Sequence, residues 1–325
     1  GSLAELLLGV AVIATVLSLV FGSVVVGVGL TAKSRSDAFL AMSDELVIAR
    51  APQRSVVLDA RGRPLAWLWR ENRQDVPLVK IAPVLRQALI DVEDSRFYDN
   101  DGIDLRGVTR ALVRDQVQVD DRKQGASTLT QQYVKNLLLL AARSRTERQA
   151  ATEQSYGRKL REARYALGLG QRLSKDEVLT GYLNLVFFGN GAYGVHVAAE
   201  TYFSTSPAAL TAPQAAVLVG LLQNPSRYDP IKNPAPARAR RDVVLARMAE
   251  LGHLTPAALA AAQAAPLGLR PGRRSAGCYG SGNGYFCDWI LKQLRRDPAL
   301  GPTPEARQSL LETGGLVIRT TLDPA

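Results

Sequence analysis

The chain opens with a long uncharged apolar stretch over residues 6–30. This is longer than the roughly 20 apolar residues that a helix needs to cross a bilayer. The alternative is a cleavable signal peptide, whose apolar region has only about 7 to 15 residues and follows basic residues. Neither condition holds here, so we predict an uncleaved transmembrane anchor over residues 1–32.

After this stretch, most apolar positions recur at the spacing of amphipathic helices. Between residues 83 and 93 they form one helical face, made of Val84, Leu85, Ala88, Leu89 and Val92. Capping residues indicate where further helices begin, and a glycine pair indicates where the last one ends. The predicted starts are Ser174, Thr211, Thr255 and Thr303, and the predicted end is Gly314-Gly315.

Two segments have the pattern of strands instead. Residues 55–70 form a predicted hairpin around residues 59–62, and residues 316–322 form a predicted strand without a local partner. An isolated hairpin is marginal in water, and an unpaired strand edge exposes backbone donors and acceptors. We therefore predict that these segments pair in one small sheet of at least three strands.

Composition narrows the classes of partner. The chain has 325 residues and a net charge of +10, which suits a membrane surface or a phosphate-bearing substrate. Nucleic acid is the rival, but no recognition motif or aromatic stacking set accompanies the basic residues. A third interpretation is that much of this charge is simply a solvated face.

The only two cysteines are Cys278 and Cys287, in a glycine-rich stretch. A metal site would need more ligands, and both histidines lie elsewhere in the sequence. In an oxidising compartment, a disulfide between them is the favoured outcome.

The candidate chemistry begins where the helical pattern of residues 83–93 ends, at Glu93. A carboxylate at the edge of an apolar face is partly desolvated, which raises its pKa. A dense run of amides and hydroxyls follows at residues 124–136, as a sugar or phosphate ligand would require. The structural alternatives are a solvated carboxylate and a helix start capped by Ser127.

A second carboxylate lies downstream. Arg158, Glu162 and Tyr165 share one helical face, and the opposite face, with Tyr156, Leu160, Ala163 and Leu167, has the pattern of a core. The alternative is an exposed Arg–Glu pair, which contributes only a few tenths of a kcal/mol. Together with Glu93, however, Glu162 completes a pair of carboxylates suited to chemistry at a sugar C1.

These motifs resemble those of the peptidoglycan glycosyltransferases (family 51), the glycan-polymerising domains of class A penicillin-binding proteins. The likeness covers about residues 55–265. It rests on Glu93-Asp94-x-Arg96-Phe97, on the specific run Gly125-Ala126-Ser127-Thr128-Leu129-Thr130-Gln131-Gln132, on Arg158-Lys159-x-x-Glu162, on Tyr182-Leu183-Asn184 with Gly189-Asn190-Gly191, and on Gln223-Asn224-Pro225-Ser226.

The resemblance implies a mainly α-helical, lysozyme-like fold and polymerisation of lipid II by an inverting single displacement. It implies that Glu93 is the general base, that Glu162 supports the site, and that the leaving group is a lipid pyrophosphate. No cofactor is firmly implied, although a divalent cation, Mg or Mn, at the pyrophosphate stays open. The implied substrate-binding residues are Asp94, Arg96, Gly125, Ser127, Thr128, Gln131, Gln132, Lys135, Asn136, Arg158, Lys159, Tyr182 and Asn184.

The sequence departs from the family at Asn100, where the family often has histidine. Asparagine does not titrate, so only a hydrogen-bonding role is expected there. The chain also contains no Ser-x-x-Lys and no Lys-Thr-Gly, so the transpeptidase half of such proteins is missing from it.

The predicted organisation is an anchor at 1–32, a membrane-proximal segment with the hairpin at 33–75, the glycosyltransferase domain at 76–265, and a disulfide loop, helix and returning strand at 266–325. Residues 116–123 are expected to be mobile, at a jaw facing the membrane. The expected partners are lipid II, the growing lipid-linked glycan, the bilayer, a transpeptidase domain and the cell-wall synthesis machinery, without nucleic acid. The catalytic domain is expected on the extracytoplasmic side of the plasma membrane. A lytic enzyme of the same fold and a non-catalytic scaffold are the alternatives.

Overall fold

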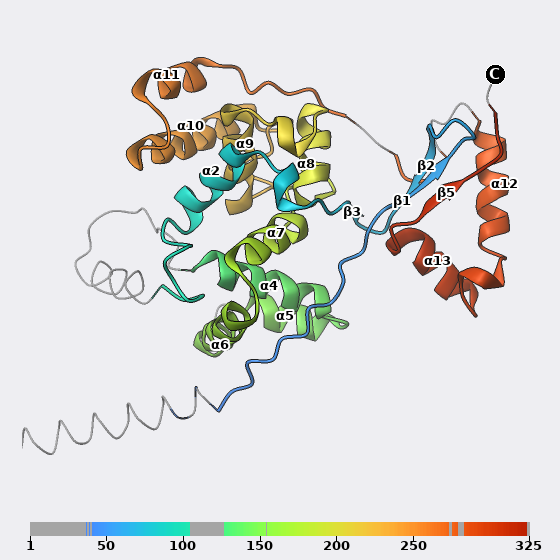
Figure 1. Cartoon of the computed structure of the whole chain (residues 1–325), viewed down its shortest axis with the longest axis horizontal. Coiled ribbons are helices and arrows are strands. Elements are labelled where there is room, and N and C mark those ends of the chain that lie inside the picture. The colour runs from blue at the N-terminus through green and yellow to red at the C-terminus, as the bar shows by residue number, and fades with distance from the viewer. Residues whose placement is uncertain are drawn as a thin grey trace, which may run out of the picture.

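The structure is a computed structural model of the whole chain (Figure 1). It describes residues 37, 39, 41–104, 127–153, 155–272, 275–278 and 283–323. These residues form a mainly helical body and a small sheet with two helices of its own. The helices are α2 (Pro83–Glu93), α4 (Leu129–Ala141), α5 (Arg145–Thr152), α6 (Tyr156–Arg172), α7 (Lys175–Leu185), α8 (Gly194–Phe203), α9 (Ala212–Gln223), α10 (Pro234–Glu250), α11 (Pro256–Ala264), α12 (Gly284–Leu294) and α13 (Pro304–Thr313).

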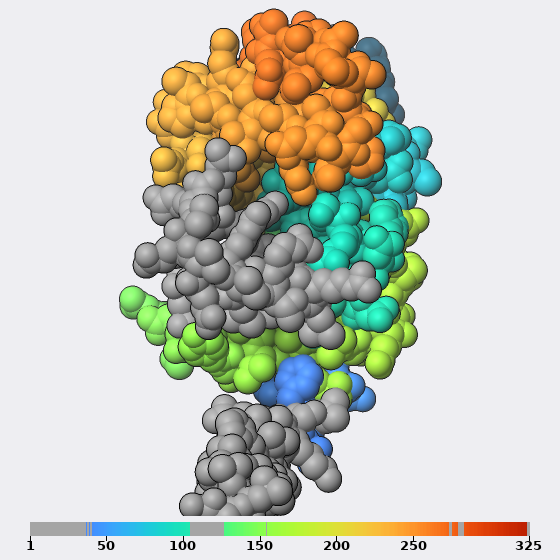
Figure 2. Space-filling model, turned by 90° about the vertical axis from the view of Figure 1, so that its left-hand side faces the viewer, coloured from blue at the N-terminus to red at the C-terminus, as the bar shows by residue number. Residues whose placement is uncertain are grey.

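The helical body is built around α9, which is apolar on every side. Its residues from Ala215 to Leu221 are all buried, as expected for a helix that is surrounded by others. α2 and α10 pack against it, while α4 packs against α6 and α7. In the view of Figure 2, the segment from α2 lies between the α10–α11 layer at the top and the yellow-green α6–α7 region below. The end of α2, which carries Glu93, is therefore placed between two helical layers.

The capping residues predicted the helix starts well. Ser174 and Thr211 each form a capping box, and Thr255 and Thr303 cap the helices that follow them. The expected cap at Ser127 is wrong by one residue, because Thr128 is the N-cap of α4. The Thr128 hydroxyl accepts from the backbone N–H of Gln131, and the Gln131 side chain accepts from Thr128 N–H at 3.0 Å. This reciprocal pair requires a glutamine or glutamate three residues after the cap, and Thr130 stands at that distance from Ser127.

The predicted sheet is confirmed. β1 (Ser55–Leu58) lies between β2 (Pro64–Leu68), which is antiparallel to it, and β5 (Val317–Arg319), which is parallel to it. The Val56 N–H donates to the Leu316 carbonyl at 2.8 Å, and the Thr320 N–H donates to the Leu58 carbonyl at 2.9 Å. The strand late in the chain thus completes a sheet that begins in the hairpin, as its missing local partner indicated.

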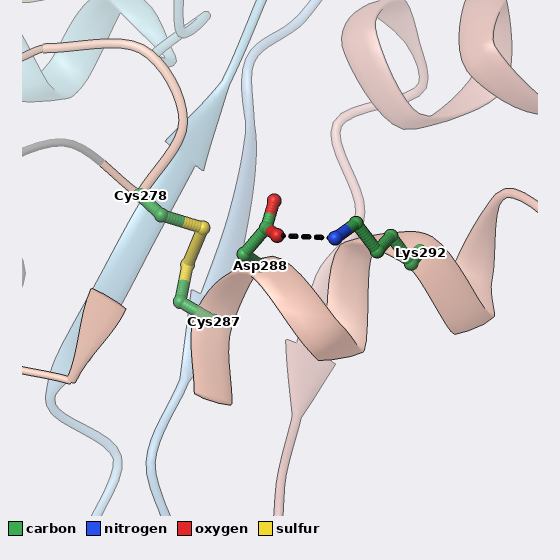
Figure 3. The surroundings of a disulfide bond; sticks show 4 residues. All are labelled: Cys278, Cys287, Asp288 and Lys292. Atoms are coloured by element: carbon green, nitrogen blue, oxygen red, sulfur yellow. Dashed lines mark ion pairs between the residues drawn. A yellow bond between two sulfur atoms is a disulfide. The ribbon is translucent and has the colours of Figure 1, made fainter. Parts of the chain in front are cut away.

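The sheet has a small hydrophobic core of its own, separate from that of the helical body. Leu291 of α12 and Leu311 of α13 pack against Val57 and Leu68 of the strands. The predicted disulfide is present: Cys278 and Cys287 are bonded, and their Cα atoms are 5.7 Å apart. This bond fixes the start of α12 to the loop that pairs with β2 at Trp67 (Figure 3).

Two buried arginines join the sheet to the helical body. Arg54 donates to Glu200 of α8 at 2.8 Å and to Gln74 at 2.6 Å, and its guanidinium lies 4.2 Å from the ring centroid of Trp67. Arg73, in β3 (Asn72–Arg73), donates to the carbonyls at the end of α7. β3 pairs with β4 (Ala192–Tyr193), so the segment between hairpin and α2 is fixed along its length.

The predicted orientation of α6 is wrong. Arg158 and Glu162 are buried, whereas Tyr156 is 92% exposed and Leu160 is 51% exposed. The charged face turns inward because Glu162 satisfies two cations there, so burial of these charges costs less than burial of isolated ones. The pattern assigned the apolar face of α6 to the core. At the N-terminal end of the helix, this face lies at the surface instead.

The predicted membrane anchor at residues 1–32 and the predicted mobile stretch at 116–123 lie outside the described residues. Among the helices that are described, none combines the length and apolarity of a membrane span.

Candidate functional site

Glu93 is the last residue of α2, whose apolar face is buried through Leu85, Ala88 and Leu89. This helix carries the Glu93 side chain to a partly buried position beside α4. Burial raises the pKa of Glu93 above 4.5, because it disfavours the charged form. A hydrogen bond from Gln132 and the charge of Arg240 act in the opposite direction, while the neighbouring Asp94 adds to the rise. Glu93 is thus a desolvated carboxylate with a specific donor.

Gln132 orients this carboxylate and is itself oriented by Tyr182. Its Nε2 donates to Glu93 Oε2 at 2.7 Å, and its Oε1 accepts from Tyr182 Oη at 2.9 Å. Tyr182 is 2% exposed and lies on α7. Its pKa is raised well above 10 by burial, with the charge of Glu93 adding to the rise, so the phenol stays a hydrogen-bond donor. Three helices therefore contribute one residue each to a chain of hydrogen bonds.

Asp94 and Asn100 hold the turn after α2 against α4. Asp94 accepts from the Leu129 N–H at 3.1 Å and from Asn100 Nδ2 at 3.1 Å. Lys175 Nζ contacts the Asn100 side-chain oxygen at 3.1 Å. Burial raises the pKa of Asp94, and these hydrogen bonds, with the charge of Lys175, lower it. Asn100 thus has the hydrogen-bonding role that the sequence left to it.

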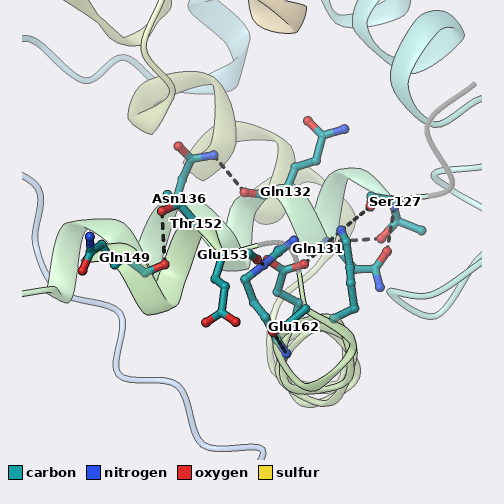
Figure 4. A network of polar contacts seen from close by, with 12 residues as sticks. Ser127, Gln131, Gln132, Asn136, Gln149, Thr152, Glu153 and Glu162 are labelled. Atoms are coloured by element: carbon teal, nitrogen blue, oxygen red, sulfur yellow. Dashed lines mark hydrogen bonds and ion pairs between the residues drawn. The ribbon is translucent and has the colours of Figure 1, made fainter. Parts of the chain in front are cut away.

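The second carboxylate, Glu162, is 1% exposed on the side chain and contacts two cations. Arg158 forms one ion pair with it, and Lys159 Nζ lies 3.1 Å from Glu162 Oε2. Lys159 also donates to Ser127 Oγ at 2.7 Å. Figure 4 shows this network, with Ser127 just before α4 and Glu162 on the neighbouring α6. Both carboxylates are therefore linked to the N-terminal part of α4, Glu93 through Gln132 and Glu162 through Lys159 and Ser127.

The other predicted site residues of α4 differ in whether their side chains already have hydrogen-bond partners. Lys135 is half-buried and has neither a hydrogen bond nor an ion pair within the described residues. Asn136 donates to the Gln132 carbonyl at 2.8 Å, and its side-chain oxygen has no hydrogen-bond partner in the part of the chain that the structure describes. Gln131 and Thr128, in contrast, are engaged in the capping box, and the Thr128 hydroxyl also donates to the Gly102 carbonyl at 2.6 Å.

Two further predicted residues are otherwise engaged, and a third is not among the residues that the structure describes. Arg96 is paired with Asp104. Asn184 is buried and forms two hydrogen bonds with the backbone of Val76, at 3.0 and 2.9 Å, which is a structural use of the side chain. Gly125 lies outside the described residues.

The structure adds Arg240 of α10, which the sequence reasoning missed. Its charge acts on Glu93 across more than a hundred residues of chain. The Arg240-Arg241 doublet is visible in the sequence, but nothing local distinguishes either arginine from the other arginines of this helix.

A cavity of about 650 Å³ lies away from Glu93. It is lined by residues 48–51 and by the other face of α4 and α7, including Tyr133, Leu137 and Gly181. A second cavity of about 350 Å³ lies between the loops around Asn190 and Asp229. Among the described residues, no three His, Cys, Asp or Glu side chains converge into a cluster that could hold a metal ion.

Comparison with known proteins agrees with this arrangement of motifs. The family model described as Transglycosylase matches residues 61–249. Penicillin-binding protein 1F of Bacillus subtilis is 33% identical over 269 residues, which is 83% of this chain and 35% of that protein. A Cupriavidus necator protein named as a transglycosylase is 37% identical over 238 residues, covering 72% of this chain and 97% of that protein.

The chain therefore belongs to the transglycosylase family, glycosyltransferase family 51, whose relatives include penicillin-binding proteins. It spans between a fifth and about a third of the length of the penicillin-binding proteins that it matches. A crystal structure of penicillin-binding protein 1A from Haemophilus influenzae matches 76% of this chain and 25% of that one, with 19% identity and a TM-score of 0.39. That likeness is too low to support a statement about the fold.

Proposed function

We propose that this protein is a membrane-anchored peptidoglycan glycosyltransferase that polymerises lipid II, with Glu93 as general base. The observation that carries the proposal is the convergence of two carboxylates on the start of α4. Glu93 is bonded to Gln132, and Glu162 is linked to Ser127 through Lys159. One carboxylate is desolvated and the other is paired with cations, which is how two roles are separated at a sugar C1.

In the proposed reaction, the 4-hydroxyl oxygen of the acceptor disaccharide attacks C1 of the lipid-linked donor. Glu93 takes the hydroxyl proton as the new C–O bond forms. The bond from C1 to the lipid pyrophosphate breaks, and its electron pair leaves with the pyrophosphate. The configuration at C1 inverts because the displacement is single. Glu93 must be ionised before the reaction and becomes protonated during it.

The leaving pyrophosphate requires positive charge. The cations near α4 differ in whether a carboxylate already neutralises them. Arg158 is buried and already paired with Glu162. Lys159 is 47% exposed on its side chain and shares Glu162 with Arg158. Lys135 has no partner among the described residues. We therefore assign Lys135 and Lys159 to the pyrophosphate, and Arg158 to holding Glu162.

The proposal includes the cellular setting. Residues 1–32 anchor the chain in the plasma membrane, and residues 33–75, 76–265 and 266–325 form the connecting hairpin, the lysozyme-like catalytic domain and the returning linker. The exposed apolar side chains Tyr156 and Leu160 of α6, beside basic residues, support contact with a lipid surface. In a longer chain, the sheet would lead to a transpeptidase domain and to the cell-wall synthesis machinery.

The test is incubation of the detergent-solubilised protein with lipid II. Polymer formed by the wild type and lost by at least a hundredfold in Glu93→Gln is the expected result, since a general base contributes about 10² to 10⁴-fold. Glu153→Gln is the matched control, because Glu153 is an exposed glutamate beside the same network. Cleavage of preformed glycan would indicate a lytic enzyme, and no reaction at all would indicate a scaffold. Either outcome would overturn the proposal.

A further inference from the structure

Tyr182, which begins the hydrogen-bonded chain to Glu93, stands in the last turn of α7. Its backbone carbonyl accepts from the N–H of Val186, the C-cap residue of the helix, at 3.0 Å. The last carbonyls of a helix lack N–H partners further along it and need donors from elsewhere. The position of the Tyr182 side chain therefore depends on what holds this turn.

Arg73 supplies two of the missing donors. Its Nε donates to the Asn184 carbonyl at 3.2 Å, and its Nη2 donates to the Leu185 carbonyl at 3.3 Å. A cation is favoured at this place, because the C-terminal end of a helix is the negative end of its dipole. Arg73 is only 1% exposed. Its charge is paired with Glu71 at 2.8 Å, and its guanidinium lies 5.1 Å from the ring centroid of Tyr193.

The same guanidinium joins the end of α7 to the segment that carries the hairpin. Its Nη1 donates to the Pro52 carbonyl, before β1, at 3.2 Å. Arg73 itself lies in β3, which Figure 1 shows between the small sheet and the helical body. The neighbouring Val76 is bonded through its backbone to the Asn184 side chain. Residues on both sides of the hairpin are thus fixed to the last turn of α7, and one buried side chain makes most of these contacts.

Arg54 makes the other buried link between the sheet and the helical body, but to a different helix. It donates to Glu200 of α8 at 2.8 Å and to Gln74 at 2.6 Å. α8 carries none of the three residues in the chain of hydrogen bonds that ends at Glu93. The protein therefore contains two arginines in similar surroundings, of which only Arg73 holds the helix that carries Tyr182.

We propose that Arg73 is a positioning residue for the reaction. By holding the last turn of α7, it sets the Tyr182 hydroxyl against Gln132, and it thereby sets the Gln132 donor against Glu93. This inference rests on the proposed function, in which Glu93 is the base. The two hydrogen bonds of this chain measure 2.9 and 2.7 Å. Because such bonds weaken once the two atoms are more than about 3 Å apart, a displacement of this turn by about half an ångström breaks the first of them.

The experiment is a double-mutant cycle of Arg73→Gln and Tyr182→Phe in the detergent-solubilised full chain. Initial rates of lipid II polymerisation are measured where a denaturant titration shows each variant to be folded. We expect Arg73→Gln alone to lower the rate by about three- to twelvefold, which corresponds to half of a hydrogen bond to a charged group. In the Tyr182→Phe background it should lower the rate by less than twofold, because both changes interrupt the same chain.

Two results in this cycle would overturn the inference. One is a wild-type rate in Arg73→Gln. The other is a double variant whose loss is the product of the two single losses, since Arg73 would then act independently of Tyr182. If Arg73→Gln does not fold, Arg73→Lys takes its place in the cycle. Lysine keeps the charge beside Glu71 but lacks the forked donors that reach two carbonyls, so its loss of rate should also disappear in the Tyr182→Phe background.

The matched control is Arg54→Gln, which removes the buried link to α8. It should lower the free energy of unfolding and leave the rate of the folded enzyme within twofold of the wild type. An equal loss of rate in Arg54→Gln and Arg73→Gln would mean that loosening either link has the same effect, and the specific role of Arg73 would be refuted.

A second measurement separates this inference from the proposed function. Nitrogen-15 NMR follows the side-chain amide of Gln132 in glutamine-labelled protein, with Gln132→Ala identifying its resonance. In Arg73→Gln this resonance should move toward its position in Tyr182→Phe, and in Arg54→Gln it should stay in place. If it moves while neither Arg73→Gln nor Tyr182→Phe lowers the rate, Arg73 positions Gln132 as inferred, but the proposed role of Glu93 fails. If the resonance does not move, the inference itself fails.

Discussion

Tyr182→Phe is a small change that tests the hydrogen-bonded chain from α7 through α4 to the base. It removes one buried hydroxyl, which donates to Gln132 Oε1 at 2.9 Å, and keeps the ring. The Gln132 amide then loses the donor that fixes which of its two ends faces Glu93. Turned by 180°, the amide would point its oxygen at the carboxylate, and the hydrogen bond of 2.7 Å from Nε2 to Glu93 would be lost.

The size of the effect follows from these two bonds. A hydrogen bond between neutral groups contributes about 0.5–1.5 kcal/mol, so we expect the free energy of unfolding to fall by about 1 kcal/mol. A hydrogen bond to a charged group is worth about 1.5–3 kcal/mol. If half of that is expressed in the barrier, the rate falls by about three- to twelvefold, since each 1.4 kcal/mol is one factor of ten. Loss of the Gln132 donor also raises the pKa of Glu93, so the loss of rate should be greatest on the acidic side.

The assay is the initial rate of lipid II polymerisation across pH, together with denaturant unfolding. Tyr133→Phe is the matched control, because Tyr133 is a buried tyrosine of α4 whose hydroxyl has no hydrogen-bond partner within the described residues. A Tyr182→Phe rate within twofold of the wild type at every pH would refute the reasoning. So would an equal loss of rate in Tyr133→Phe.

Three further perturbations have defined outcomes. Glu162→Gln leaves Arg158 and Lys159 without their carboxylate, so the free energy of unfolding should fall by about 3 kcal/mol in a denaturant titration. Adding Arg158→Gln should restore part of this loss. An unchanged free energy of unfolding in Glu162→Gln would mean that the ion pair is dispensable. Replacing Cys278 and Cys287 by serine should lower the stability of the sheet unit by about 2–3 kcal/mol, the chain-entropy value for so short a loop, and unchanged melting would contradict this. Deleting residues 3–32 should lower the rate on long-chain lipid II more than on short-chain analogues, and equal losses would argue against the anchor.

Features that depend on local chemistry could be predicted from the sequence. Ser174, Thr211, Thr255 and Thr303 mark helix starts because a hydroxyl three residues before an unpaired N–H satisfies it wherever the helix later packs. The pairing of residues 55–70 with residues 316–322 in one sheet could be inferred, because each segment alone would leave backbone groups without hydrogen bonds.

Features that depend on packing could not be predicted in this way. The apolar pattern of α6 suggested that Tyr156 and Leu160 face the core, but the inward face was decided by Glu162 and the two cations it satisfies. Asn184 and Gln131 lie within the motifs, yet their side chains form hydrogen bonds with backbone groups. Arg240 of α10 lies against Gly220 of α9, and its charge lowers the pKa of Glu93 on α2, a relation between three helices that no spacing along the chain encodes.

The parallel pairing of β1 with β5 gives the protein a defined response to mechanical load. Ser55, the first residue of β1, and Arg319, the last residue of β5, lie at opposite ends of this pair of strands. Because the two strands run in the same direction, opposed forces at these points slide one along the other. The hydrogen bonds from Val56 to Leu316 and from Thr320 to Leu58 are then strained together and not one after another. Tension carried between these two points would thus be borne by this sheet in shear.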